Sequence, residues 1–285
     1  MLKKIVCGRF ELEFSRTLIM GVLNVTPDSF SDGGLFLDAG RAVEHAKQMA
    51  DEGADIIDIG GESSRPNAEP VSEEEELKRV APIIKKLAEE LNVPMSIDTC
   101  KPAVAEECIK MGASIVNDIT GLRNKEMLKA VAKYKVPVII MHMKGEPKNM
   151  QQNPEYENVV DEIKFYFKEK INAARNLGIN QIVTDPGIGF GKTTGHNLQI
   201  LKRLQEFKTL DCPILVGPSR KSFIGNIAGL PANERLEGTL AAVSIAVMNG
   251  ANIVRVHDVK ECKRAIQIAD AIKNEKFLYS KWTKL

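Results

Sequence analysis

The 285-residue chain carries 39 Lys and Arg against 38 Asp and Glu residues, and a formal net charge of +1 gives no overall field that favours nucleic acid or a membrane surface. Its hydrophobic fraction of 44% and charged fraction of 27% are typical of soluble globular proteins, and no apolar run approaches the roughly 18 residues of a membrane span. Five cysteines without a C-x-x-C pair favour free thiols over disulfides or a zinc site, so we expect a cytoplasmic protein.

The first residues predict a hairpin followed by a buried strand. Residues 3–16 contain two short period-two stretches on either side of Gly8 and Arg9, and we expect this hairpin to close the bottom of a barrel. Residues 18–24 form a continuous apolar run, which is typical of a strand buried on both faces. A polar, turn-rich loop follows to residue 34, and a helix is predicted from about residue 38 to residue 52.

The same strand–loop–helix pattern then recurs along the chain. Further strands are predicted at residues 56–59, 94–97, 114–116, 136–141, 182–184, 213–216 and 253–254. Further helices are predicted at residues 72–91, from 102, and at 125–134, 159–174, 197–210, 236–247 and about 258–273. Strict alternation implies a parallel sheet, and eight such units in this length predict a (β/α)8 TIM barrel. An open doubly wound sheet is the competing fold.

Neither a linker nor a change in composition divides the chain. We therefore predict one domain over residues 1–285, with the hairpin at residues 1–16 and a C-terminal tail at residues 274–285 that has no clear pattern.

In a barrel of this kind, the residues that follow each strand converge on one pocket. The residues at these strand exits are Asn24, residues 58–65, Asp98, Asn117, Asp118, His142, Asp185, residues 219–221, Arg255 and His257. Carboxylate and amide groups suit a flat, nitrogen-rich ring, because they can pair with its N–H groups. The cations suit phosphate or diphosphate, and Arg255 and His257 project to one face because they are two residues apart on a strand. The pattern therefore indicates a phosphorylated heterocycle as the ligand.

Structural roles compete with these assignments. A strand-end Asp or Asn can simply cap the next helix, and we expect Asp58 and Asp118 to be structural. His142 is expected to be a packed histidine, the glutamates at 73–76 a solvated helix start, and the cysteines small core residues.

The glycine-rich segment at residues 185–192 also invites comparison with a phosphate-binding P-loop. The P-loop pattern requires Gly five residues before the Gly that precedes Lys, and Pro186 stands at that position. The sequence therefore argues against an NTPase.

In these motifs the chain resembles the dihydropteroate synthase family, from about residue 18 to residue 271. The motifs are residues 24–34 (NVTPDSFSDGG), 61–66 (GESSRP), 96–99 (SIDT), 117–119 (NDI), 141–143 (MHM), 185–192 (DPGIGFGK), 219–222 (SRKS) and 255–259 (RVHDV). The resemblance implies that a 7,8-dihydropterin carrying a CH2-diphosphate condenses with 4-aminobenzoate to give dihydropteroate and diphosphate. It also implies that sulfonamides compete with 4-aminobenzoate, and that the protein is a homodimer formed through its last helices.

The resemblance assigns roles to matching residues. Those that would hold the pterin are Asp98, Asn117, Asp185 and Lys221. Those that would hold the diphosphate are Asn24, Ser64, Arg255 and His257, with Mg2+ at Asn24, and Val256 is expected to be a substrate-binding residue. Those that would shape the 4-aminobenzoate site are Ser63, Arg65, Pro66, Phe190 and Ser222, with Asp32 ordering the first loop. The resemblance implies catalytic roles for Asp98, Asp185, Lys221, Arg255 and His257.

The sequence departs from the family pattern at two positions. Ser64 stands where Thr is common and keeps the hydroxyl group, and Pro218 stiffens the strand exit that leads to Lys221. The alternative functions are a methyltransferase that moves a methyl group from methyltetrahydrofolate to a corrinoid protein, and a non-catalytic pterin-binding paralogue. Lys192 is a candidate for the phosphate side or for anchoring its loop.

Overall fold

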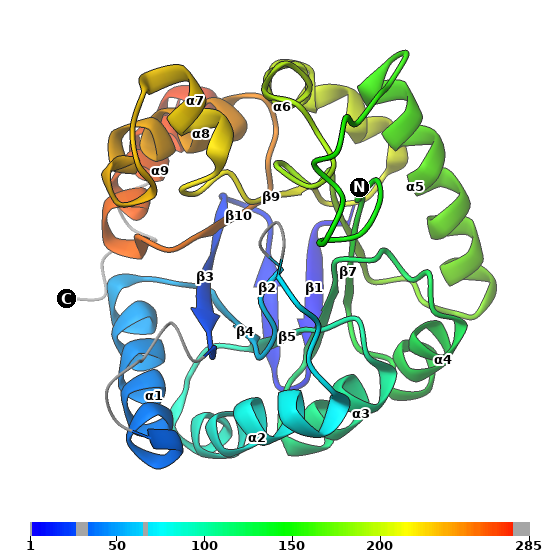
Figure 1. Cartoon of the computed structure of the whole chain (residues 1–285), viewed down its shortest axis with the longest axis vertical. Coiled ribbons are helices and arrows are strands. Elements are labelled where there is room, and N and C mark those ends of the chain that lie inside the picture. Colours follow the sequence, from blue (N-terminus) through cyan, green and yellow to red (C-terminus); the bar gives the residue numbers. More distant parts are fainter. Residues whose placement is uncertain (1, 27–33, 65–67, 276–285) are drawn as a thin grey trace.

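A computed structural model describes residues 2–26, 34–64 and 68–275. Its main sheet contains eight parallel strands in the order β8-β7-β6-β5-β4-β3-β10-β9 (Figure 1). They are β3 (Leu18–Asn24), β4 (Ile56–Gly60), β5 (Met95–Asp98), β6 (Ile115–Asp118), β7 (Val138–Met141), β8 (Ile182–Asp185), β9 (Leu215–Val216) and β10 (Ile253–Val256).

The two outer strands of this sheet meet. Thr184 of β8 forms a parallel bridge with Ile214, next to β9, and the backbone N–H of Thr184 donates to the carbonyl of Pro213 at 2.9 Å. The sheet therefore closes into the predicted barrel, and the doubly wound alternative is wrong.

Helices surround the barrel, and most follow the predicted pattern. They are α1 (Gly34–Glu52), α2 (Glu73–Glu90), α3 (Pro102–Met111), α4 (Lys125–Tyr134), α5 (Val159–Asn176), α6 (Thr194–Lys202), α7 (Ser222–Ala228), α8 (Leu236–Met248) and α9 (Val259–Asn274). The short helix α7 was not predicted, because seven residues are too few for a clear helical period.

The helix predicted at residues 197–210 is split. After α6, the chain continues as a 3-10 helix, Leu204–Leu210, whose buried residues are Leu204, Phe207 and Leu210. A spacing of three residues fits the 3-10 helix, which has 3.0 residues per turn, so all three side chains reach the core.

The strands bury both faces, but the two faces differ in chemistry. Side chains that point outward pack against the helices in the large apolar core, as Val254 and Val256 of β10 do. On the inner face of the same strand, Ile253 lies in an apolar cluster near the start of the strands. Two residues later, Arg255 also points inward, because side chains alternate along a strand. The barrel thus has an apolar lower interior and a polar upper end.

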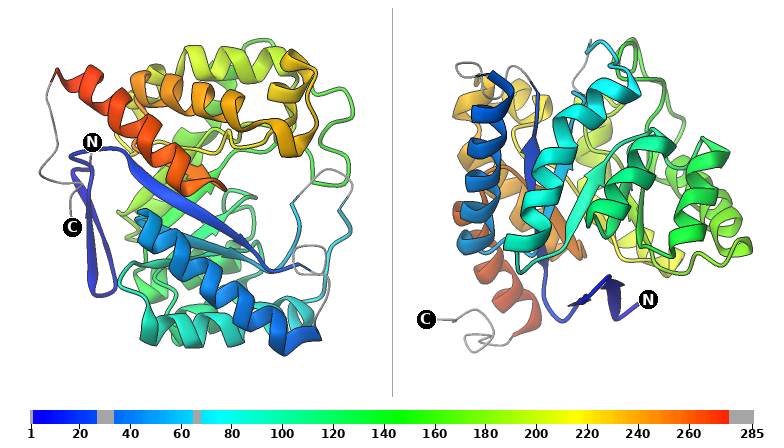
Figure 2. Two further views of the ribbon diagram at one scale, coloured as in Figure 1. Left: turned by 90° about the vertical axis from the view of Figure 1, so that its left-hand side faces the viewer. Right: turned by 90° about the horizontal axis from the view of Figure 1, so that it is seen from below.

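The N-terminal hairpin covers the lower end, as expected (Figure 2). Strands β1 (Lys4–Cys7) and β2 (Phe10–Glu13) are antiparallel, and Ile5 and Cys7 join the inner apolar cluster. The backbone N–H of Val6 donates to Oε1 of Gln181, just before β8, at 2.6 Å.

All five cysteines are free thiols, and four of them are buried. Within the described residues, none of the helices has both the length and the apolar character needed to cross a membrane.

The hairpin gives a test of the barrel floor. Ile5 is 1% exposed and its strand neighbour Val6 is 45% exposed, so the two residues form a matched pair. We expect Ile5→Ala to lower the free energy of unfolding by about 2–5 kcal/mol, because it leaves a cavity in the inner cluster. Val6→Ala should change it by less than about 0.5 kcal/mol. Equal effects in denaturant titrations would contradict a floor sealed by the hairpin.

Candidate active site

The upper end of the barrel is centred on one guanidinium group. Nε of Arg255, on β10, donates to Oδ2 of Asp58 at 2.6 Å, and Nη2 donates to Oδ2 of Asp98 at 2.7 Å. Asp58 lies on β4 and Asp98 ends β5, so the ion pairs span the mouth of the barrel. One guanidinium thus pairs with two carboxylates. The second carboxylate oxygen of Asp58, Oδ1, is buried without a hydrogen-bond partner in the described chain.

An amide and a third carboxylate complete this floor. Nδ2 of Asn117, at the end of β6, donates to Oδ2 of Asp58 at 3.0 Å. Asp185, at the end of β8, is 6% exposed and accepts the backbone N–H of Gly187 at 2.8 Å. The predicted residues Asp98, Asn117, Asp185 and Arg255 therefore do converge.

Burial raises the pKa of two carboxylates of this floor, those of Asp185 and Asp98. Burial raises the pKa of Asp185 to about 6, although the N–H of Gly187 and the cations Lys221 and Arg255 oppose it. Burial also raises the pKa of Asp98, and the ion pair with Arg255 offsets this only in part. Both groups would gain from a ligand that brings N–H donors, because such donors stabilise the charged form.

Lys221 lies over the ring of Phe190. Its Nζ is 4.0 Å from the ring centroid, which is a cation–π distance. Burial, and to a smaller extent the positive charge of Arg255, lowers the pKa of Lys221 to about 8. The N–H of Lys221 donates to the carbonyl of Pro218 at 3.3 Å, and this turn brings the side chain to Phe190.

Two glycines of the 185–192 segment allow very close backbone contact. Gly187 and Gly191 have φ of +69° and +62°, and a Cβ atom on them would lie 2.0 and 2.2 Å from the carbonyl oxygens of His142 and Lys144. Only glycine fits these positions without displacing the segment that follows β7.

Lys192 anchors this glycine segment. It is 2% exposed, and its Nζ contacts the carbonyls of Phe190 at 2.9 Å and His142 at 3.2 Å, and Nδ1 of His142 at 3.1 Å. All three hydrogen positions of the ammonium thus have an acceptor. Of the two roles left open for Lys192, loop anchoring is the one that fits.

Three backbone N–H groups of the glycine segment also have acceptors within the protein. Gly187 donates to Asp185, Gly189 to Oδ1 of Asn197 at 2.8 Å, and Phe190 to the carbonyl of Gly187 at 3.1 Å. A P-loop needs such groups free for phosphate, so the geometry agrees with the sequence in excluding it.

His257 and Ser219 form a second polar pair at the mouth. Oγ of Ser219 lies 3.0 Å from Nδ1 of His257 and accepts the backbone N–H of His257 at 3.3 Å. Burial, and to a smaller extent the positive charge of the neighbouring cations, lowers the pKa of His257 to about 3. Arg220 turns away, with φ of +57°, and pairs with Asp258.

A cavity of about 390 Å³ opens beside Asp98. Its lining includes Glu62, Ser63, Ser64, Asp98, Thr99, Cys100, Ile119 and Met143. Ser63 and Ser64 are therefore at the site, on the loop after β4. Asn24 ends β3, next to β10 in the sheet, and its amide forms no hydrogen bond to the residues that the structure describes.

The remaining predicted residues lie less centrally. Asp32, Arg65 and Pro66 lie outside the described residues. The side chain of Val256 belongs to the outer core, so only its backbone can face a ligand. Ser222 is exposed at the start of α7.

Two residues, Asp118 and His142, have the structural roles expected of them. Asp118 accepts the backbone N–H groups of Thr120 and Leu122 at 2.8 Å, which confirms a loop-forming role. His142 is buried and meets the ring of Tyr166 edge-on at 5.0 Å, which confirms that it is packed.

Asp58 has the structural role expected of it, although it binds Arg255 and Asn117 instead of capping a helix. One expectation about the acidic residues was wrong. Glu76 is not solvated: it is fully buried and pairs with Lys101. The alternation on β4 could have revealed Asp58, because it lies two residues after inward-facing Ile56.

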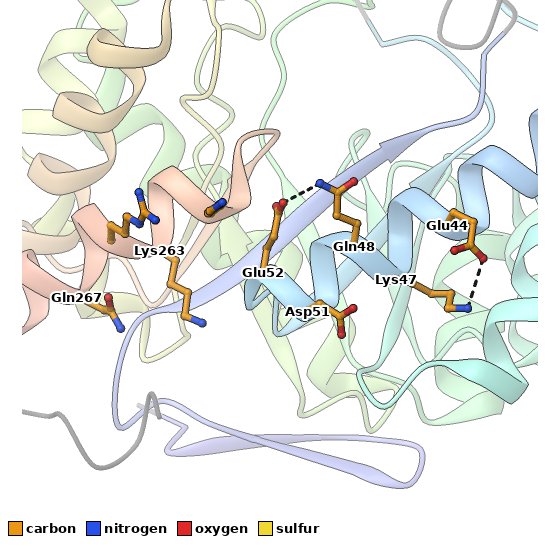
Figure 3. A pocket seen from close by; sticks show the side chains of 9 residues that line it. Glu44, Lys47, Gln48, Asp51, Glu52, Lys263 and Gln267 are labelled. Carbon is orange, nitrogen blue, oxygen red and sulfur yellow. Dashed lines mark hydrogen bonds and ion pairs between the residues drawn. The ribbon is translucent and has the colours of Figure 1, made fainter. Parts of the chain in front are cut away.

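The surface also has a hollow between α1 and α9 (Figure 3). Acidic and amide side chains of α1, including Asp51 and Glu52, face Lys263 and Gln267 of α9. This hollow lies on the outer flank, away from the strand ends, so it is not the candidate active site.

The chain matches a known family over most of its length. Residues 20–257 fit the family model described as pterin binding enzyme. The chain belongs to the pterin binding enzyme family.

Individual relatives of this pterin binding enzyme share both sequence and fold. The dihydropteroate synthase of Clostridium beijerinckii is 51% identical over 261 residues, which cover 90% of the chain and 94% of the relative. The Yersinia pestis dihydropteroate synthase, in complex with a sulfonamide drug, superposes with a TM-score of 0.91 at 45% identity, covering 95% of this chain and 99% of its own. The Xanthomonas albilineans enzyme in complex with 7,8-dihydropteroate gives 0.87 at 40% identity, covering 95% and 98%.

The raised pKa of Asp185 predicts how this pterin binding enzyme responds to pH. The folded protein holds a proton on Asp185 up to about pH 6, whereas the ordinary value is 3.8, so this group's contribution to stability is lost as the pH rises through 6. Asp185→Asn carries no such charge. We expect the variant to exceed the wild type in free energy of unfolding by about 2–3 kcal/mol at pH 8 and by much less at pH 4. Denaturant titrations that give the same difference at both pH values would contradict this.

Proposed function

We propose that this pterin binding enzyme is a dihydropteroate synthase. It joins (7,8-dihydropterin-6-yl)methyl diphosphate to 4-aminobenzoate and releases 7,8-dihydropteroate and diphosphate. The relatives support this reaction, and one observation carries it within the site: Arg255 and His257 face the same mouth as the carboxylate floor of Asp98 and Asp185. Cations above a carboxylate and amide floor suit a substrate that is a phosphate ester at one end and a nitrogen heterocycle at the other.

The floor residues would bind and then stabilise the pterin. Asp185 and Asn117 would accept from and donate to the edge of the ring, and Lys221 would lie beside it. When the bond between the methylene carbon and the diphosphate oxygen breaks, positive charge spreads from the methylene into the ring. The negative charges of Asp98 and Asp185 would oppose that positive charge, which is electrostatic stabilisation of the transition state.

The leaving group would be held by the cations at the mouth. The N–H groups of Arg255 that Asp58 and Asp98 leave free would bind phosphate oxygens, and His257 and Ser64 would contact the same group. His257 is neutral in the absence of a ligand, since burial and nearby cations lower its pKa to about 3. A bound dianion would favour its protonated form, so that a second charge would arise where the diphosphate leaves.

The attacking group needs little activation. The amine nitrogen of 4-aminobenzoate already carries a lone pair, so it can attack the methylene carbon as the C–O bond breaks and then lose a proton to solvent or to the departing diphosphate. Phe190, beneath Lys221, and Ser63 and Ser222 would shape this side of the site. Arg65 and Pro66 remain proposed for the same side, and Asp32 remains proposed to order the first loop. Catalysis would then consist mainly of positioning and charge neutralisation.

The protein side chains at the mouth of the barrel could bind Mg2+ only if the substrate supplied most of the metal ligands. Asn24 offers an amide oxygen beside β10. In the described part of the chain, no group of three or more His, Cys, Asp or Glu side chains could hold a metal alone. Mg2+ commonly binds through few protein groups and phosphate oxygens, so we propose Asn24 as its protein ligand. When bound, the ion would neutralise charge on the diphosphate.

The grip on the diphosphate is the point that can be tested directly. The wild-type protein should release diphosphate only when Mg2+, the dihydropterin diphosphate and 4-aminobenzoate are all present. Arg255→Lys keeps a cation near Asp58 and Asp98 but has fewer N–H donors left for phosphate oxygens. We expect its KM for the dihydropterin diphosphate to rise about 10- to 100-fold, as for one lost charged hydrogen bond.

The control for this variant is a ligand without the diphosphate. The affinity of 6-hydroxymethyl-7,8-dihydropterin, measured by calorimetry, should fall much less in Arg255→Lys than the affinity for the dihydropterin diphosphate. An unchanged KM in the variant would remove Arg255 from the diphosphate site. A methyltransferase acting on a corrinoid protein would have no need for such a grip.

We also propose a homodimer formed through α8 and α9, which pack side by side (Figure 1). Ile245 and Met248 on α8 are 50% and 45% exposed, and Ile268 and Ile272 on α9 are 64% and 62% exposed. These pairs lie three and four residues apart, so each helix presents an apolar stripe, as expected for a buried interface.

Charged substitutions would test this interface. Ile268→Glu combined with Ile272→Glu should give a monomer in sedimentation velocity, because it places four carboxylates in a twofold interface. Phe165→Glu, on α5, is the control, since Phe165 is also 64% exposed. A monomeric wild type, or a dimer that survives the double substitution, would refute the proposal.

A further inference from the structure

The buried glutamate of α2 requires an explanation. Glu73 and Glu74 are exposed at the start of the helix, but Glu76 is completely buried. A buried carboxylate is costly unless it is paired. Its partner is Lys101, whose Nζ lies 2.5 Å from Oε2 of Glu76. The same ammonium also binds the carboxylate of Glu62.

These three residues come from three separate elements. Glu62 lies in the loop after β4, directly before Ser63 and Ser64. Lys101 lies in the connection after β5, three residues after Asp98, and Glu76 lies on α2. Helices α2 and α3 pack side by side and are joined to β4 and β5 by these segments (Figure 1). The ammonium of Lys101 therefore ties two loops of the site to one rigid helix.

A second contact holds the same loop on the same helix. Nη1 of Arg79 donates to the carbonyl of Gly61 at 2.9 Å. A Cβ atom on Gly61 would lie 2.8 Å from Cγ1 of Val80 and 3.0 Å from Cγ of Glu76. The loop backbone thus lies directly on α2, and the segment that bears Ser63 and Ser64 starts from a fixed point.

The charge of Lys101 is secure in this setting. Burial alone would lower its pKa, but the hydrogen bonds with Glu62 and Glu76 outweigh burial and raise it. Two carboxylates share one ammonium, and Oε1 of Glu76 has no partner in the described chain. Loss of Lys101 would leave the buried carboxylate of Glu76 without its cation and would release Glu62.

We propose that Lys101 is a positioning residue that fixes the loop of Ser63 and Ser64 relative to Asp98. This inference rests on the proposed function, in which Ser63 and Ser64 serve the 4-aminobenzoate and diphosphate while Asp98 serves the pterin. Lys101 then sets the distance between the two substrates without touching either.

The test must separate positioning from folding. Lys101→Met alone leaves Glu76 unpaired, so the informative variant is Lys101→Met with Glu76→Gln, which removes the buried charge. We expect it to fold, with kcat/KM for 4-aminobenzoate lowered about 10- to 100-fold, because a displaced loop misplaces the attacking group. The affinity for 6-hydroxymethyl-7,8-dihydropterin, measured by calorimetry, should stay within about twofold, because Asn117 and Asp185 lie on other strands and Asp98 remains paired with Arg255.

Controls make the result specific. Lys110 and Glu107 form an exposed pair on α3, so Lys110→Met with Glu107→Gln should change neither constant. Lys101→Arg alone, which keeps a cation beside Glu62 and Glu76, should retain most of the wild-type kcat/KM. A folded Lys101→Met, Glu76→Gln protein with unchanged kcat/KM, or one that loses dihydropterin affinity equally, would overturn the proposal. A wild type that makes no dihydropteroate would instead overturn the proposed function.

Discussion

The upper barrel depends on one guanidinium shared by two buried carboxylates. Without Arg255, Asp58 and Asp98 would be like charges facing each other in a medium of low dielectric, which is strongly unfavourable. With it, the strands β4, β5 and β10 are linked at their active ends, and Asn117 joins through Asp58. The pairing leaves an excess of negative charge, so the folded protein carries an electrostatic cost that a donor-rich ligand can relieve. Such local conflict with stability is common at functional sites.

A second constraint is steric. Gly187 and Gly191 pass so close to the carbonyls of His142 and Lys144 that the two segments behave as one rigid wall. Lys192 closes the gap by meeting three acceptors, and Tyr156 adds a hydrogen bond to the carbonyl of Gly191 at 2.9 Å. Phe190 and Asp185 sit at either end of this wall. Their separation is therefore set by backbone packing rather than by flexible side chains, which suits a site that works by positioning.

Much of the fold and of the candidate site could be predicted from the sequence, because both follow from local pattern. The alternation of strand and helix gave the barrel, and strand exits identified Asp98, Asn117, Asp185 and Arg255. Pairings between distant residues had no local signal: Glu76 looked like a solvated N-terminal acid, since Lys101 lies 25 residues away. Asp58 looked like a cap because its partner Arg255 is 197 residues away. The outward direction of the Val256 side chain follows from the alternation of side chains along a strand. The match of residues 255–259 to a family motif nevertheless led to its prediction as a site residue.

The hairpin seals the lower end of the barrel, and Ile5, Cys7 and the inward-facing aliphatic residues fill its interior. In the part of the chain that the structure describes, the barrel is therefore a cup that opens at the ends of its strands rather than a passage. Whatever binds at Asn117 and Asp185 lies deepest in this cup and is covered by whatever binds after it. On the proposed assignment, the pterin must arrive before 4-aminobenzoate, and the ring that entered first is the last part of the product to leave. The order of events would thus be imposed by the closed floor, with no moving gate required.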